Sequence, residues 1–157
     1  MKICVLVLDN IRSVENTGSI FRTAECFGVS KIILVGTTPA PTDRFGRKRK
    51  DFAKVALGAE KLVNWKHVDD LKSQILNLKK EGYKIVALEQ HSKSKNLSTC
   101  QVDTLGKLAL IVGNEVEGVS RGVLDIVDEI VEIPMKGKKE SLNVAVATGI
   151  TLFKLCK

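Results

Sequence analysis

The sequence predicts an α/β fold in which an open, mainly parallel sheet is flanked by helices. Three observations lead to this prediction: short apolar runs bounded by polar residues, stretches between them with apolar residues at helical spacing, and turns that separate the two. The chain has 157 residues, of which 44% are hydrophobic, so it is long enough to bury a core of its own. We therefore expect a single domain over residues 1–157.

Five apolar runs are predicted to be the strands of this sheet. Apolar runs of this length without polar alternation are typical of strands that are buried on both faces of a parallel sheet. They cover residues 3–8, 31–35, 84–88, 108–112 and 129–133. Because open α/β sheets bind ligands beyond the C-terminal ends of their strands, the residues that follow these runs are the first candidates for a site.

Helices are predicted between the strands wherever apolar residues recur at spacings of three and four. Three of them cover residues 18–27, 71–81 and 121–127. Gly28 and Gly82 follow the first two in the position of C-terminal caps. Asp69 or Asp70 precedes the second helix, and Ser120 precedes the third, in the position of N-terminal caps.

Three other segments are polar or ambiguous. Residues 9–16 are expected to be a polar connection before the first helix. The pattern of residues 53–65 allows a short helix and a short strand at 62–63, and it does not decide between elements here. Residues 89–105 are polar, and a single loop histidine such as His91 is more often solvated than catalytic.

The C-terminal helix has the clearest helical pattern and follows a polar turn. Ser141 stands where an N-cap belongs, so the remaining free amides of the first turn are expected to face a polar or anionic group in the turn. The apolar positions form one stripe, which we expect to be buried. The stripe consists of Leu142, Ala145, Val146, Gly149, Ile150 and Phe153.

Charge favours a polyanionic partner, because the formal net charge is +7 and the pI is about 9.3. Positive residues are densest in the polar segment 36–52, which also carries Phe45 and Phe52. A solvated loop and an RNA-contacting loop both fit this composition. The cationic residues of this segment are Arg44, Arg47, Lys48, Arg49 and Lys50.

The four cysteines are far apart and form no C-x-x-C pair, so neither a zinc knuckle nor a redox pair is predicted, and no metal is expected. The N-terminal apolar run is too short for a signal segment or a membrane span. We therefore expect a cytoplasmic protein with no membrane partner.

Three segments together resemble the three motifs of the SpoU (TrmH-like) family of SPOUT-class RNA 2′-O-ribose methyltransferases. They cover residues 16–24, 110–120 and 133–143, in the order and spacing of that family. The resemblance implies methylation of a ribose 2′-hydroxyl in tRNA or rRNA with S-adenosyl-L-methionine as cofactor. It also implies a C-terminal trefoil knot and a homodimer whose site is built across two chains.

Carried over by position, the resemblance implies a set of catalytic residues: Arg22, Asn16, Glu115, Ser141 and Asn143. It implies a second set that contacts the cofactor: Leu88, Gly113, Ile133, Met135, Ser141 and Leu142. Because glycine has no side chain, Gly113 suits a pocket wall where the backbone approaches the adenosine of the implied cofactor closely. The cationic residues of 44–50 become RNA-binding candidates, since many relatives carry an added N-terminal RNA-binding domain and this chain begins at the catalytic strand.

The role of Arg22 has two interpretations. Family proposals make its equivalent the general base, yet a guanidinium has a pKa of about 12 or higher and is a poor base. In the second interpretation the guanidinium binds an RNA phosphate and holds the ribose in line with the methyl group.

Two other functions compete with methyl transfer. A non-catalytic RNA-binding protein on the same fold is disfavoured by the intact Arg22, Ser141 and Asn143. A different nucleotide-binding α/β protein is disfavoured because the sequence contains neither a G-x-x-x-x-G-K-[ST] motif nor a G-x-G-x-x-G motif after the first strand.

Overall fold

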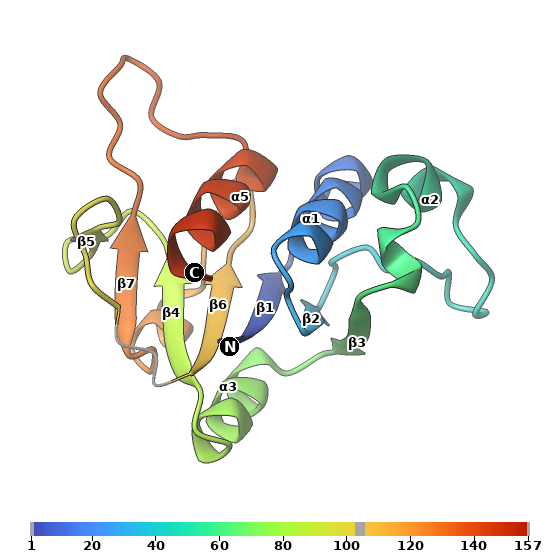
Figure 1. Cartoon of the computed structure of the whole chain (residues 1–157), viewed down its shortest axis with the longest axis horizontal. Helices are drawn as coiled ribbons and strands as arrows, with labels where there is room; N and C mark the ends of the chain where they lie inside the picture. The colour runs from blue at the N-terminus through green and yellow to red at the C-terminus, as the bar shows by residue number, and fades with distance from the viewer. Residues whose placement is uncertain (1, 103–105, 157) are drawn as a thin grey trace.

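The computed structural model describes residues 2–102 and 106–156. Within them, seven strands form one open sheet in the order β3-β2-β1-β6-β4-β7-β5, and every neighbouring pair is parallel (Figure 1). The strands are β1 (Ile3–Asp9), β2 (Lys31–Val35), β3 (Asn64–Val68), β4 (Lys84–Leu88), β5 (Lys95–Asn96), β6 (Lys107–Val112) and β7 (Glu129–Glu132). The helices are α1 (Val14–Cys26), α2 (Lys50–Ala56), α3 (Leu71–Lys80), α4 (Arg121–Leu124) and α5 (Val144–Leu155), with a 3-10 turn η1 (Ala59–Lys61).

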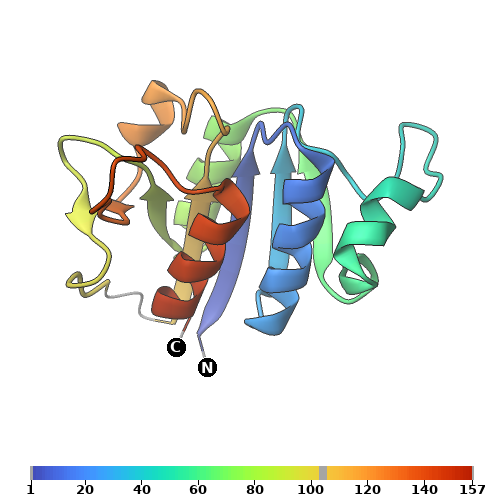
Figure 2. The same ribbon diagram turned by 90° about the horizontal axis from the view of Figure 1, so that it is seen from above.

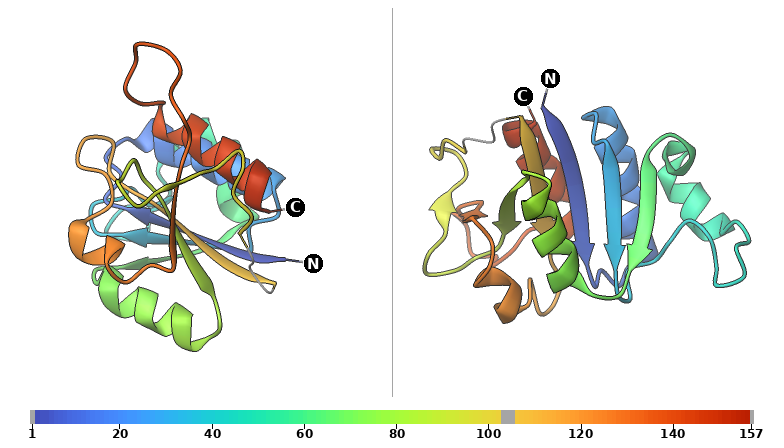
Figure 3. Two further views of the ribbon diagram at one scale, coloured as in Figure 1. Left: turned by 90° about the vertical axis from the view of Figure 1, so that its left-hand side faces the viewer. Right: turned by 90° about the horizontal axis from the view of Figure 1, so that it is seen from below.

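Helices cover both faces of the sheet. The helices α1 and α5 lie side by side over one face, and α3 and α4 lie over the other (Figures 2 and 3). One core lies beneath α1, α2 and α5 and includes Leu6, Phe21 and Leu152, whereas the opposite core includes Val7 and Ile75. Because alternate residues of the central strands enter different cores, these strands need apolar residues on both faces.

The predicted parallel α/β sheet is confirmed, and the bounds of β2 and β4 are those predicted. The bounds of the three other predicted strands agree within one residue. The sequence does not predict β3 and β5, which lie at the two edges of the sheet. All of their residues are exposed or half-buried, so the apolar signal is missing there, and the short strand suggested at 62–63 is absent.

Helix α1 begins four residues earlier than predicted. Ser13 is its N-cap, and its Oγ accepts a hydrogen bond from Asn16 N at 3.0 Å. The prediction of a connection through Asn16 is therefore wrong, because the polar residues form the outer side of a helical first turn. Gly28, with φ +70°, follows the C-cap Phe27, as predicted.

The caps of the next two helices differ in their agreement with prediction. Asp70 caps α3 and accepts a hydrogen bond from Ser73 N at 3.2 Å, as predicted. Ser120 precedes α4 but makes no side-chain cap bond, and the helix ends at Leu124 rather than Val127. A few residues later the Asp128 carboxylate accepts a hydrogen bond from Ile85 N of β4, next to the start of β7, which pairs with that strand.

Two predictions for α5 are wrong. Asn143 rather than Ser141 is the N-cap, and its Oδ1 accepts hydrogen bonds from the first-turn amides at 2.9 and 3.3 Å. The apolar stripe faces outward, with Val146 52% and Ile150 43% exposed. The helix packs inward through Thr148, Thr151, Leu152 and Leu155 instead. Both threonine hydroxyls donate to backbone carbonyls one turn earlier, which makes their burial inexpensive.

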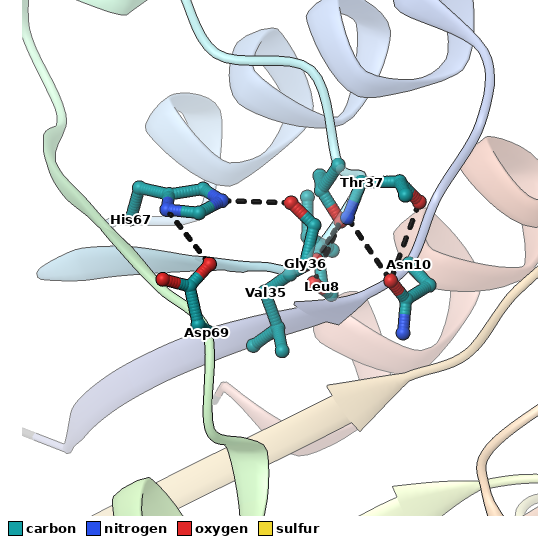
Figure 4. Close-up of polar contacts among 8 residues, drawn as sticks. Leu8, Asn10, Val35, Gly36, Thr37, His67 and Asp69 are labelled. Carbon is teal, nitrogen blue, oxygen red and sulfur yellow. Dashed lines mark hydrogen bonds and ion pairs between the residues drawn. The ribbon is translucent and has the colours of Figure 1, made fainter.

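A network of polar contacts fixes the C-terminal ends of β1, β2 and β3 (Figure 4). Asn10, at φ +53°, accepts a hydrogen bond from Thr37 N at 3.0 Å. The Thr38 hydroxyl contacts carbonyl oxygens of β1 and β2 at 2.9 and 2.8 Å. His67 Nε2 contacts Gly36 O at 2.7 Å. These contacts hold in place the edge from which segment 36–49 departs.

In the part of the chain that the structure describes, no helix is long and apolar enough to span a lipid bilayer. All four cysteines are free thiols; Cys4 is buried and Cys26 is exposed.

Candidate active site

A pocket of about 570 Å³ opens at the C-terminal edge of β4, β6 and β7. Leu88, at the end of β4, and Gly113, directly after β6, form part of its wall. The segment after β7 and the start of α5 complete it. These later segments contribute Ile133, Met135, Ser141, Leu142 and Asn143.

The loop after β6 is folded around Asn114, which is buried. Its backbone pairs with Gly118 in both directions, at 3.2 and 2.9 Å. The Oδ1 atom accepts hydrogen bonds from Val116 N and Glu117 N, and Nδ2 donates to Asn10 O at 2.7 Å. Asn114 therefore holds the pocket loop and ties it to the end of β1.

Gly113 is needed for a reason that differs from the one expected. A Cβ at this position would lie 2.3 Å from both Gly118 C and Val119 N, which are backbone atoms of the same loop. The close approach is thus between two segments of the protein. A larger residue at Gly113 would distort the loop before it met any ligand.

Glu89 and Gln90 also line the pocket, and the sequence analysis assigns them no role. Glu89 Oε2 accepts a hydrogen bond from Val119 N at 2.8 Å, and Gln90 Nε2 donates to Glu140 O at 2.7 Å. These residues therefore connect the end of β4 to the loop after β6 and to the turn before α5. Their signal in the sequence is their position directly after a buried strand.

The carboxylate of Glu115 lies against the N-terminus of α1. It accepts hydrogen bonds from Arg12 N at 3.1 Å, from Ser13 N at 3.3 Å and from Asn16 Nδ2 at 3.2 Å. Desolvation acts to raise the pKa of Glu115, but these hydrogen bonds, together with one from its own backbone N–H, outweigh it and lower the pKa. An ionised carboxylate with its oxygens engaged in this way is suited to positioning α1, and it is a weak proton acceptor.

Asn16 extends this contact to the third segment. Its Oδ1 accepts a hydrogen bond from Asn143 Nδ2 at 3.1 Å, while its Nδ2 faces Glu115. The same Asn143 side chain caps α5. One chain of hydrogen bonds thus joins residues from all three motif-like segments at the mouth of the pocket.

Of the five predicted catalytic residues, Arg22 alone does not line the pocket of its own chain. Its side chain is exposed on α1, six residues beyond Asn16, and it does not line the pocket within the described chain. Ser19 and Thr23, on neighbouring positions of the helix, line a separate groove between α1 and α5, which also includes Asn16 and Asn143.

The electrostatic character of the pocket is acidic. Four glutamates are among its lining residues: Glu89, Glu115, Glu132 and Glu140. Among the described residues that line it, none is a lysine or an arginine. A phosphate-bearing ligand would meet like charge in this environment. A ligand with cationic groups, by contrast, fits the surrounding charge.

Segment 36–49 ends in a hairpin over residues 41–49 and is not an open loop. Thr42 and Lys48 form an antiparallel bridge, and Asp43 N donates to Arg47 O at 2.8 Å. Arg47 and Arg49 are ion-paired with Asp43 and Asp51, each at 2.8 Å. Arg44 and Lys48 are exposed.

Lys50 and Phe52, which the sequence analysis also assigns to this polar segment, belong to α2. Lys50 is the first residue of α2. Phe52 is fully buried and packs edge-on against Phe21, with ring centroids 5.1 Å apart. Phe52 is therefore a core residue, and Phe45 is the aromatic residue that the hairpin exposes.

Comparisons with known proteins agree with this arrangement. The chain matches the family described as the SpoU rRNA Methylase family over residues 3–153. It is 33% identical to the tRNA (guanosine(18)-2'-O)-methyltransferase of Aquifex aeolicus, over 96% of this chain and 67% of that protein. It is 35% identical to the 23S rRNA (guanosine-2'-O-)-methyltransferase RlmB of Escherichia coli K12, over 96% of this chain and 58% of that protein. The chain thus spans little more than half the length of this second relative.

Solved structures are similar over nearly the whole chain. The AdoMet-bound rRNA methyltransferase from Sinorhizobium meliloti gives a TM-score of 0.86 at 28% identity, covering 97% of this chain and 55% of that one. The A. aeolicus TrmH/SpoU tRNA modifying enzyme gives a TM-score of 0.84 at 31% identity, covering 99% and 75%. These likenesses confirm the predicted fold class, a parallel α/β sheet of the SPOUT α/β-knot type.

Proposed function

The chain belongs to the SpoU rRNA methylase family, and on that premise we propose that it methylates a ribose 2′-hydroxyl of tRNA or rRNA with S-adenosyl-L-methionine. The observation that carries the proposal is the convergence of three distant segments on one pocket. Asn16, Glu115 and Asn143 are joined there by hydrogen bonds, although Asn16 lies 99 residues from Glu115 and 127 residues from Asn143 in the sequence.

The pocket fits the cofactor in shape and charge. Its walls include Gly113, which has no side chain, and four residues with apolar side chains: Leu88, Ile133, Met135 and Leu142. Such walls suit an adenosine, and the acidic character of the lining suits the sulfonium and ammonium groups of S-adenosyl-L-methionine. When bound, this cofactor supplies a methyl group that is already activated by its positive sulfur, so an acceptor held in line is the main requirement.

The residues at the pocket mouth are assigned to holding that acceptor. Ser141 lines the pocket two residues before the N-cap of α5, where its hydroxyl can contact a ribose. Asn143, Asn16 and Glu115 are positioning residues, since their polar atoms are engaged with one another and with the first turns of α5 and α1. Arg22 binds an RNA phosphate next to the target ribose, which its permanent charge and forked geometry favour.

The proposal includes a homodimer formed through the α1–α5 face. Val146 and Ile150 expose an apolar stripe on α5, next to the groove of about 520 Å³ between the two helices. Stripes of this kind are typical of interfaces. The groove contains Asn16 and Asn143, so a second copy on this face lies against the site and brings its own α1, with Arg22, to the pocket of its partner.

RNA capture is assigned to the basic hairpin. Its candidates are Arg44, Arg47, Lys48 and Arg49, together with Lys50 at the start of α2. Arg47 and Arg49 are each paired with a carboxylate, which neutralises part of their charge. Arg44, Lys48 and Lys50 are exposed and are the stronger candidates for phosphate contacts.

Free thiols on the chain accord with the reducing cytoplasm that we propose as its location.

Calorimetric titration with S-adenosyl-L-methionine tests the proposal without knowledge of the RNA. Saturable binding is expected for the native protein and for Arg22→Ala, which lies outside the pocket. Ala147→Leu, which places three additional carbon atoms in the pocket from the first turns of α5, should lose binding and keep a cooperative melting transition. Absence of binding by the native protein would favour a non-catalytic RNA-binding protein on this fold.

A further inference from the structure

The tip of the basic hairpin exposes an aromatic ring that is in contact with two guanidinium groups. Phe45 is 67% exposed, although apolar rings of this size are normally buried. Arg44 Cζ lies over its ring at 4.8 Å from the centroid, and Arg47 Cζ lies at 5.1 Å. No packing requirement of the fold accounts for this ring, whereas its neighbour Phe52 fills the core.

The backbone holds this tip in one conformation. Gly46 N donates to Asp43 O at 3.0 Å, and Gly46 has φ +76°, so residues 43–47 form a type I turn followed by a left-handed glycine. Asp43 Oδ1 accepts hydrogen bonds from Phe45 N at 2.8 Å and from Arg47 N at 3.0 Å. Asp43 Oδ2 accepts one from Arg47 Nε at 2.8 Å. Phe45 and Arg47 are therefore presented on a preformed support.

A preformed surface of this chemistry fits an unpaired nucleobase. Aromatic rings and guanidinium planes both stack on bases that are out of a duplex, and the guanidinium charge also meets the adjacent phosphates. Bases within a helix are already stacked on their neighbours and are not available to such a surface. The ring thus selects RNA with an unpaired base, and the charges alone would accept any RNA.

We propose that Phe45, flanked by Arg44 and Arg47, is a stacking platform for an unpaired base of the RNA substrate. The inference rests on the proposed function, because it concerns the RNA that the enzyme captures. The hairpin leaves the C-terminal end of β2, the same edge of the sheet at which the pocket opens, and it lies beyond α1 and α2 (Figures 1 and 2). The base that stacks there is therefore a different one from the nucleotide whose ribose enters the pocket.

Binding of a fluorescent oligoadenylate, compared with a strand of equal length that carries abasic residues, tests the platform. The native protein should bind the strand with bases more tightly. Phe45→Ala should weaken that binding by about 5- to 100-fold and leave the affinity for the abasic strand unchanged. Phe45→Leu should behave like the alanine variant because it keeps apolar volume without a ring, and Phe45→Trp should retain native affinity.

Two results would overturn the platform: equal binding of both strands by the native protein, or equal binding of oligoadenylate by the native and Phe45→Ala proteins. The outcome is separate from that of the cofactor titration. A protein that shows the Phe45 effect without binding S-adenosyl-L-methionine would refute the methyltransferase and keep the platform. Cofactor binding without a Phe45 effect would support the methyltransferase and refute the platform.

Discussion

Asn143 Nδ2 donates a hydrogen bond to Asn16 Oδ1 at 3.1 Å, and this contact joins the first turns of α5 and α1 across 127 residues of sequence. The orientation of the Asn16 amide is set from the other side, where its Nδ2 faces the Glu115 carboxylate. Since Asn143 also caps α5, the same side chain serves both the stability of the helix and the geometry of the site.

Substitution of Asn143 can separate these two roles. Asn143→Asp keeps a cap acceptor at the positive end of α5 and places an oxygen against Asn16 Oδ1. We expect its melting temperature to equal or exceed that of the native protein, and methyl transfer to fall by about 10- to 100-fold. Asn143→Ala should lose both activity and about 1 kcal/mol of unfolding free energy. Full activity in the aspartate variant would remove the Asn16 contact from the mechanism.

The pKa of Glu115 predicts how the stability of this region depends on pH. Because the folded state lowers the pKa, the contribution of the ionised carboxylate is present above the unfolded pKa of about 4.3. It is lost as the pH falls through the lower folded value. Glu115→Gln should therefore melt a few degrees below the native protein at neutral pH, and the difference should close in acid.

Glu117→Gln provides the control for this experiment, since Glu117 is an exposed carboxylate of the same loop. Its melting curve should follow that of the native protein at every pH. A gap for Glu115→Gln that persists unchanged into acid would show that Glu115 contributes through packing rather than through its charge.

The central strands could be predicted from the sequence because their signals are local, whereas the three motif-like segments are identified by their resemblance to a family. A strand buried on both faces reads as an apolar run, and the residues after it fall at one edge of the sheet. The exposed α5 stripe could not be placed, because a hydropathy pattern does not state whether a stripe is covered by its own chain or by another. The inward-facing Thr148 and Thr151 carry no apolar signal at all.

The basic hairpin shows a second kind of limit. Its turn depends on Asp43 and on the left-handed Gly46, a combination typical of a three-residue hairpin loop, yet the surrounding charge hides it within a polar segment. Phe45 and Phe52 have the same hydropathy, but Phe45 is exposed and Phe52 is buried. Phe52 packs against Phe21, which is distant in the chain, so the local sequence does not show which of the two phenylalanines enters the core.

The α5 stripe predicts how the protein associates. Ile150→Glu places a charge in the centre of the proposed interface and should convert a dimer into a monomer in sedimentation velocity experiments, with loss of methyl transfer. Leu76→Glu is the matched control, because Leu76 is 44% exposed on α3 at the opposite face of the sheet, close to the 43% of Ile150. If the two variants sediment alike, the dimer does not use the α1–α5 face.

The exposed cationic side chains of the hairpin predict how RNA binding depends on salt. Arg44→Gln and Lys48→Gln should each reduce the slope of log affinity against log salt by about 0.7 to 0.9, the value for one phosphate contact. Lys72→Gln, on α3, should leave the slope unchanged, although it alters the net charge equally. If the native protein and the two hairpin variants show equal slopes, Arg44 and Lys48 do not contact RNA phosphates.

The exposed position of Arg22 predicts complementation between two inactive proteins. Arg22→Ala should bind S-adenosyl-L-methionine with native affinity and transfer no methyl group, whereas Ala147→Leu should bind no cofactor. In a dimer of one chain of each, the pocket of the Arg22→Ala chain is intact and faces the native Arg22 of its partner. Mixing the two proteins should therefore restore methyl transfer. If the mixed dimers form, as detected with a tag on each chain, and stay inactive, then Arg22 acts on the pocket of its own chain.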